Sequence, residues 1–149
     1  MSDDIVILGG ARTAIGTFGG TLAGTPATTL GATVAREALS RAGVEGAQIG
    51  HVVFGNVINT EPRDMYLSRV AAMEAGVPDA VPAMNVNRLC GSGVQAIVSA
   101  VQSLMLSDAD FALAGGAESM SRAPYIQPAA RWGQKMGDVA SLDMLLGTL

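Results

Sequence analysis

A single cysteine, a single histidine and few aromatic side chains occur in this chain of 149 residues, and only 15% of its residues are charged. One cysteine cannot form an internal disulfide, which indicates a reducing compartment. The absence of a Cys/His cluster argues against a bound metal ion. The net charge of -4 and the pI near 4.7 argue against nucleic acid or an anionic membrane as the main partner.

Targeting and membrane-spanning patterns are also missing. The N-terminus, MSDDIVILGG, is acidic and then only briefly apolar, whereas a signal peptide needs a basic start and a longer apolar run. The longest apolar stretches fall short of the roughly 18 to 20 residues that a membrane span requires. We therefore expect a soluble, cytoplasmic protein that does not associate with membranes.

Apolar residues are abundant, at 49% of the chain, and there are 19 glycines, a composition that suits tightly packed layers. Apolar stretches typical of short strands span 5–10, 49–58, 82–87 and 109–116. Helical patterns lie between them, at 28–43, 62–78 and 90–108. This alternation predicts an α/β fold whose sheet is covered on both faces.

The residue composition of the chain changes after Glu118. The stretch 119–137 contains the only tryptophan, two of the six prolines and three of the nine basic residues, and it indicates an excursion away from the sheet. The last residues, 139–149, place four leucines at helical spacing, which predicts a helix with an apolar face. No stop signal follows, so the pattern resembles an unfinished module.

Cys90 lies in NRLCGSG, at the joint between a predicted strand and a predicted helix. Unpaired backbone N–H groups at a helix start favour a thiolate, and Gly91 and Gly93 leave room for a substrate and for amides near an oxyanion. Such a joint lies at the carboxyl end of the sheet, where α/β sheets bind ligands. Two interpretations stay open on this pattern alone: an acyl-accepting nucleophile, or a small buried side chain.

Four other polar residues receive structural interpretations. His51 opens a strand, a position that favours a structural or surface role. The glycine-rich stretch 9–20 lacks the spacing of a phosphate-binding loop, so Arg12 is expected to hydrogen-bond within the structure or at an interface. Arg88 and Glu118 flank the carboxyl end of the sheet and could pair, as scaffolding rather than chemistry.

Four motifs, NRLCGSG, GGAESMSRAP, ARTAIGTFGG and GNVI, closely resemble those of the thiolase family, the acyl-CoA C-acetyltransferases. They occur in the family's order and spacing, and the resemblance covers essentially the whole chain. TEPRDMYLSRVAAMEAG and PAARWGQKMGD are most similar to the bacterial β-ketothiolases. A ketosynthase-like acyltransferase is disfavoured, because GGAESMSRAP resembles thiolases specifically.

The resemblance implies that Cys90 takes an acyl group from acyl-CoA as a thioester and passes it to a second CoA species, forming or cleaving a 3-ketoacyl-CoA. It also implies that the backbone N–H of Cys90 contributes to an oxyanion hole. Coenzyme A thioesters are then the substrates, and no cofactor is expected. Leu149 aligns with a family residue that lines the pantetheine channel.

The fold implied is the first half of a thiolase, an α/β layer sandwich on a mixed five-stranded sheet whose last strand is missing here. Residues 1–118 would be the half-domain that carries the nucleophile, and 119–149 the start of the loop domain. The family forms dimers through the first halves and tetramers through a loop that matches RAPYIQPAARWGQKMG. The basic patch of Arg122, Arg131 and Lys135 is therefore expected to serve tetramerisation rather than CoA phosphates.

The family's activating histidine, its second cysteine and an asparagine lie in a second half that this chain does not contain. We therefore expect the 149-residue chain alone to be inactive, with those groups supplied by a longer polypeptide or another chain. The alternative is a non-catalytic, truncated chain that acts as a binding or assembly subunit.

Overall fold

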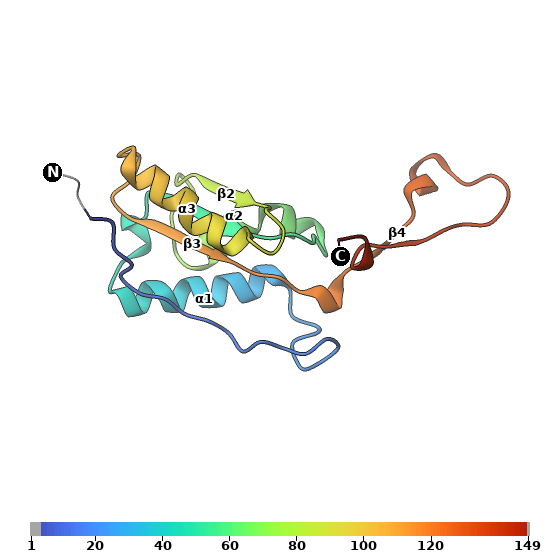
Figure 1. Cartoon of the computed structure of the whole chain (residues 1–149), viewed down its shortest axis with the longest axis horizontal. Coiled ribbons are helices and arrows are strands. Elements are labelled where there is room, and N and C mark those ends of the chain that lie inside the picture. The colour runs from blue at the N-terminus through green and yellow to red at the C-terminus, as the bar shows by residue number, and fades with distance from the viewer. Residues whose placement is uncertain (1–3, 149) are drawn as a thin grey trace.

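A three-stranded parallel sheet forms the centre of the molecule (Figure 1) in the computed structural model, which describes residues 4–148. The strands are β1 (His51–Gly55), β2 (Ala83–Val86) and β3 (Ala112–Gly116), in the order β2-β1-β3. The α/β class is thus confirmed, whereas the sheet has three parallel strands among the described residues instead of the mixed five-stranded sheet, less its last strand, that the resemblance implied.

Helices cover both faces of this sheet. On one face, α1 (Ala27–Ala42) and α2 (Leu67–Glu74) enclose a core with Phe54 at its centre. On the other face, α3 (Ser92–Met105) packs against Val53. Successive side chains of a strand point to opposite faces, so the apolar run of β1 is buried on both sides.

The helix α3 turns its small side chains inward. Ser92, Ala96 and Ala100 are buried against the sheet, whereas the larger side chains of Val94 and Met105 are 69% and 71% exposed. Small residues let the helix axis approach the strands closely. The distance at which Ser92, Ala96 and Ala100 pack against the sheet therefore sets the position of the first turn of α3.

The predicted strand at 5–10 is extended but belongs to no sheet among the described residues, so that prediction is wrong for this structure. Among the described residues the outer edges of β2 and β3 carry no further strand, and the segment lies along the end of α1 instead. There the Arg41 guanidinium donates to the Gly10 carbonyl at 3.2 Å. Ile7 is left 82% exposed.

The second and third helices are shorter than the predicted ranges 62–78 and 90–108. Residues Pro62–Tyr66 form a 3-10 turn, here called η2, before α2 begins. The first helix ends as predicted at Gly43, whose φ of 65° is left-handed and whose N–H caps the last carbonyls. Further 3-10 turns occur, at η1 (Gly46–Gln48), η3 (Met120–Arg122), η4 (Pro128–Trp132) and η5 (Leu146–Thr148).

Residues 123–148 form an arm that extends away from the sheet (Figure 1). Its base is a small antiparallel ladder of β4 (Tyr125–Ile126) and β5 (Leu142–Asp143). The predicted helix over 139–149 is therefore wrong within the described part: Leu142 pairs with Ile126, and a turn with the 3-10 helix η5 follows. Leu149 lies outside the described residues.

The division at residue 118 stays a prediction, although β3 ends at Gly116 and the arm departs soon afterwards. Within residues 4–148, no helix is long and apolar enough to cross a membrane.

Candidate functional site

Cys90 lies at the carboxyl end of the sheet, between β2 and α3. The strand ends at Val86 and the helix begins at Ser92 with Gly91 as its N-cap, so Cys90 lies two residues before the first helical residue and not in the helix predicted over 90–108. Its side chain is free and exposed. The burial expected of a core cysteine is thus not observed.

The turn that carries Cys90 has an uncommon backbone. Leu89 has a φ of 49°, a left-handed conformation that side chains other than glycine rarely adopt. Three bonds hold it there: the Leu89 N–H donates to Asn87 Oδ1 at 3.0 Å, and Ser92 Oγ accepts from the Arg88 N–H at 2.8 Å and donates to the Leu89 carbonyl at 2.7 Å. The turn is therefore preorganised before any ligand arrives.

Gly55, the last residue of β1, touches the start of α3. A Cβ at this position would lie 2.8 Å from the carbonyl carbon of Ser92 and 2.9 Å from its side chain. Real side chains do not approach so closely, so only glycine fits between the strand and the turn. In contrast, a Cβ on Gly93 would meet nothing within 4 Å.

Glu118 binds the segment that follows β1. One carboxylate oxygen accepts from the Val57 N–H at 2.9 Å, and the other accepts from the Ile58 N–H at 2.9 Å and from Asn56 Nδ2 at 3.0 Å. Burial raises the pKa of Glu118, and the two backbone N–H bonds partly oppose that rise.

Arg88 and Glu118 do not pair with each other. The Arg88 guanidinium instead donates to Gln95 on α3 at 2.6 Å. Both residues make hydrogen bonds within the structure, and their scaffolding role stays a prediction. Arg12 makes none of the hydrogen bonds or ion pairs found among residues 4–148, so an internal role for it is not observed.

Two hollows border this edge of the sheet. The smaller, of about 230 Å³, lies between the segments that follow β1 and β2, close to the Cys90 turn. Its lining residues are Asn56, Val57, Asn59, Met65, Asn85, Val86 and Asn87. The larger, of about 550 Å³, lies between the N-terminal segment, α1 and the residues after β3, and includes both Arg12 and Glu118.

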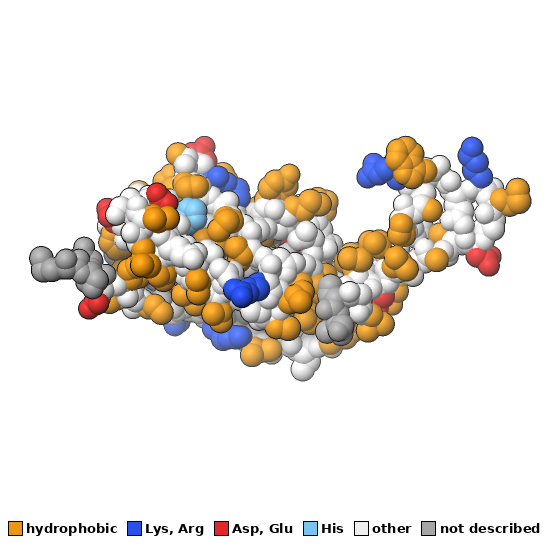
Figure 2. Space-filling model, turned by 45° about the horizontal axis from the view of Figure 1, so that its top comes forward, with side chains coloured by type: hydrophobic (Ala, Val, Ile, Leu, Met, Phe, Trp, Pro, Cys, Tyr) orange, Lys and Arg blue, Asp and Glu red, His pale blue; other side chains and the backbone are white. Residues whose placement is uncertain are grey.

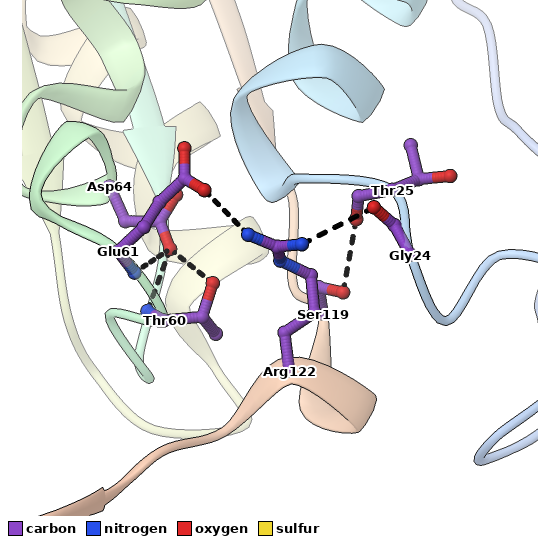
Figure 3. A network of polar contacts seen from close by, with 7 residues as sticks. All are labelled: Gly24, Thr25, Thr60, Glu61, Asp64, Ser119 and Arg122. Atoms are coloured by element: carbon purple, nitrogen blue, oxygen red, sulfur yellow. Dashed lines mark hydrogen bonds and ion pairs between the residues drawn. The ribbon is translucent and has the colours of Figure 1, made fainter.

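Arg122 anchors the root of the arm (Figure 3). Its guanidinium pairs with Glu61 at 2.5 Å and donates to the Gly24 carbonyl at 3.2 Å, between η2 and the loop before α1. Arg122 therefore belongs to this contact rather than to a basic patch with Arg131 and Lys135. The latter two remain exposed on the arm, where basic and hydrophobic side chains lie together (Figure 2).

His51 stands at the opposite end of β1 from Cys90. It pairs in register with Ala112 at the start of β3, whereas the ends of the strands, at Gly55 and Val86, point toward the Cys90 turn. This placement supports the structural interpretation. Among the described residues, no three side chains of metal-binding type gather into a cluster.

Sequence reasoning singled out Cys90 but missed the groups that hold its turn. Asn87 and Ser92 stand three residues before and two residues after it. Such short spacings are typical of side chains that bond nearby backbone, and this signal could have found them. Nothing local pointed to Asn56, because its partner is 62 residues further along the chain.

The family model described as "Thiolase, N-terminal domain" matches residues 5–148. The chain belongs to the thiolase family. It is 63% identical over 149 residues to the beta-ketothiolase BktB of Cupriavidus necator, covering all of this chain and 38% of that protein. It is 43% identical to an acetyl-CoA acetyltransferase of Pseudomonas aeruginosa, covering 96% of this chain and 36% of that protein.

Solved thiolases share the fold. A human mitochondrial 3-ketoacyl-CoA thiolase in complex with CoA matches 95% of this chain and 36% of that one, with a TM-score of 0.91 and 38% identity. The Bacillus anthracis acetyl-CoA acetyltransferase matches 97% and 36%, with a TM-score of 0.89 and 37% identity. The thiolase chain described here thus spans little more than a third of the length of its relatives.

Proposed function

We propose that this chain is the nucleophile-bearing portion of an acyl-CoA C-acyltransferase, a β-ketothiolase, with Cys90 as the acyl-accepting group. The observation that carries the proposal is the exposed thiol on a preorganised turn, at the carboxyl end of a thiolase sheet. A relative named as a beta-ketothiolase, 63% identical over the whole chain, supports the same reaction class.

The first step transfers an acyl group. In synthesis the Cys90 thiolate attacks the thioester carbonyl carbon of an acyl-CoA, the new C–S bond forms, and the bond to CoA breaks to release the CoA thiolate. In cleavage it attacks the 3-keto carbon of a 3-ketoacyl-CoA, and the C2–C3 bond breaks to release the carbanion of acetyl-CoA, which takes up a proton. In the second step the acyl group leaves Cys90 for the carbanion of acetyl-CoA or, in cleavage, for the thiolate of free CoA. The backbone N–H of Cys90 is our candidate for one oxyanion donor in both steps.

Acid–base groups must come from outside these 149 residues. The chain has one cysteine and one histidine, and His51 lies at the far end of β1 from Cys90. We propose that a longer polypeptide or a second chain supplies the base and a second cysteine. The length of the relatives, of which this chain covers 38% or less in the cases given, supports that arrangement.

The partners follow from the same proposal. We propose coenzyme A thioesters as substrates without a further cofactor, a dimer or homotetramer as the assembly, and a cytoplasmic location. The arm supports an assembly role, because Trp132 and Met136 are 83% and 92% exposed there. The predicted contact of Leu149 with pantetheine remains part of this proposal.

A chimera tests the proposal: residues 1–149 replace the matching residues of the Cupriavidus necator enzyme, to give what we call the reconstituted enzyme. We expect it to cleave acetoacetyl-CoA in the presence of CoA and to gain one acetyl group on Cys90 by mass spectrometry. Cys90→Ser should abolish turnover, whereas Ser103→Ala, which removes a hydroxyl from the far end of α3, should not. Undiminished turnover by a Cys90→Ser enzyme, or a folded chimera with none, would refute the proposal.

A further inference from the structure

The carboxylate of Glu118 joins the ends of two strands at the edge where Cys90 lies. Glu118 follows β3, and the three N–H groups that it binds all belong to residues 56–58, directly after β1. Asn56 Nδ2 also donates to the Ala117 carbonyl at 2.9 Å. No other carboxylate among the described residues accepts hydrogen bonds from this segment.

The segment that Glu118 holds is one wall of the smaller hollow. Asn56, Val57 and Asn59 form that wall, and residues 85–87 form the wall facing it. Cys90 lies three residues after Asn87, the last residue of the facing wall. The Asn56 N–H also donates to the Val86 carbonyl at 3.1 Å, so the two walls are tied together at their base.

The surroundings of Glu118 make the clamp, that is, its hydrogen bonds to residues 56–58, sensitive to protonation of the carboxylate. The carboxylate is half-buried, Asp64 acts on it from η2 as a like charge, and Arg12 lines the same large cleft from the N-terminal segment. Burial raises its pKa above 4.5, more than the bonds from Val57 and Ile58 lower it. As the pH falls through this raised pKa the carboxyl gains a proton, and one of its oxygens then becomes a poor acceptor.

We propose that Glu118 is a positioning residue for acyl transfer: its carboxylate fixes the Asn56–Asn59 wall of the hollow beside Cys90, against which the acyl group of the thioester is placed. The inference rests on the function proposed for Cys90. It assigns to Glu118 no contact with the reacting atoms.

Glu118→Gln probes the clamp with little change in shape. Its amide oxygen keeps one acceptor, while its NH₂ group would face an N–H donor of the segment and leave that donor unpaired. Glu61→Gln is the matched control, because Glu61 is also a partly buried carboxylate but binds Arg122 instead of the 56–58 amides.

Steady-state kinetics of the reconstituted enzyme separate positioning from general stability. Loss of one charge-assisted bond should raise KM for acyl-CoA roughly five-fold in Glu118→Gln, with kcat within about two-fold of the parent. A merely structural role would lower kcat through loss of active enzyme and leave KM unchanged. In the parent, KM should rise as the pH falls through the raised pKa of Glu118, whereas Glu118→Gln should lack this rise.

Hydrogen–deuterium exchange of the 149-residue chain itself gives a readout independent of turnover. The peptide that contains residues 56–59 should exchange several-fold faster in Glu118→Gln than in the parent or in Glu61→Gln, because two of its amides bind the carboxylate. Equal exchange in all three proteins would overturn the inference.

The outcomes distinguish the inference from the proposed function. If the parent enzyme acetylates Cys90 and Glu118→Gln matches it in KM at every pH, the inference fails and the proposed function stands. If the parent folds but never acetylates Cys90, the proposed function fails and takes the inference with it.

Discussion

Replacing Gly55 by alanine should disturb the Cys90 turn more than any other change of one methyl group at this edge. The added Cβ would lie 2.8 Å from a backbone carbon of Ser92, whereas an ordinary contact begins at 3.4 Å, so strand and helix must separate by about 0.6 Å. Gly55 belongs to the backbone of β1 and the Ser92 carbonyl carbon to that of α3, so neither atom can rotate away from the contact. Overpacking of this kind costs about 1–3 kcal/mol of unfolding free energy.

Urea unfolding followed by circular dichroism measures that cost. With a slope of roughly 2 kcal/mol per molar urea, the midpoint should fall by about 0.5–1.5 M. The rate at which iodoacetamide alkylates Cys90 should also change in Gly55→Ala. The reason is that Ser92, which the new methyl group displaces, binds the carbonyl of Leu89, the residue before Cys90.

Gly93→Ala is the matched control, since it adds the same methyl group to α3 in open space. It should raise the unfolding free energy, by up to about 1 kcal/mol, because alanine is the better helix former. A Gly55→Ala protein with the parental midpoint and alkylation rate would show that the strand end and the turn are not in rigid contact.

Three further predictions concern other parts of the chain. Residues 1–149 alone should show no cleavage of acetoacetyl-CoA, since each missing acid–base group contributes about 10²–10⁴-fold; ordinary turnover would bring His51 back as a candidate base. Deleting residues 123–136 from the reconstituted enzyme should convert tetramers to dimers by light scattering, and a persistent tetramer would assign the arm another role. A hydrogen bond to Asp143 raises the pKa of Tyr125 above 10.0, so this contact stabilises the hairpin below that pKa and is lost as the pH rises through it. In an ultraviolet titration, Tyr125→Phe should remove a tyrosine transition from above the ordinary range, and an unchanged profile would exclude this bond.

The sequence predicted the elements whose pattern is set locally. Three strands and three helices occur where apolar periodicity placed them, and Gly43 ends its helix as expected. Cys90 was found because the glycines around it mark a joint between two such elements. Its exposure at the carboxyl edge follows from the parallel order of the strands.

Elements that depend on distant partners could not be predicted in the same way. The stretch 5–10 has the composition of a strand, but pairing requires a neighbour with a free edge, and composition does not specify one. The leucines at 142–149 fit helical spacing, yet Leu142 also fits a ladder with Ile126, which the structure adopts. Glu118 finds its amide partners only because β1 and β3 are neighbours in the sheet.

The inward alanines of α3 act as spacers for the Cys90 side chain. Ala96 and Ala100 fix the height at which the helix rests on Val53, and Cys90 stands at the near end of that helix. A larger side chain at either position would lift one end of the helix and tilt the thiol relative to the strand ends. The position of the Cys90 thiol can therefore change by fractions of an ångström through substitutions on the sheet-facing side of α3, at residues that do not neighbour it in the sequence.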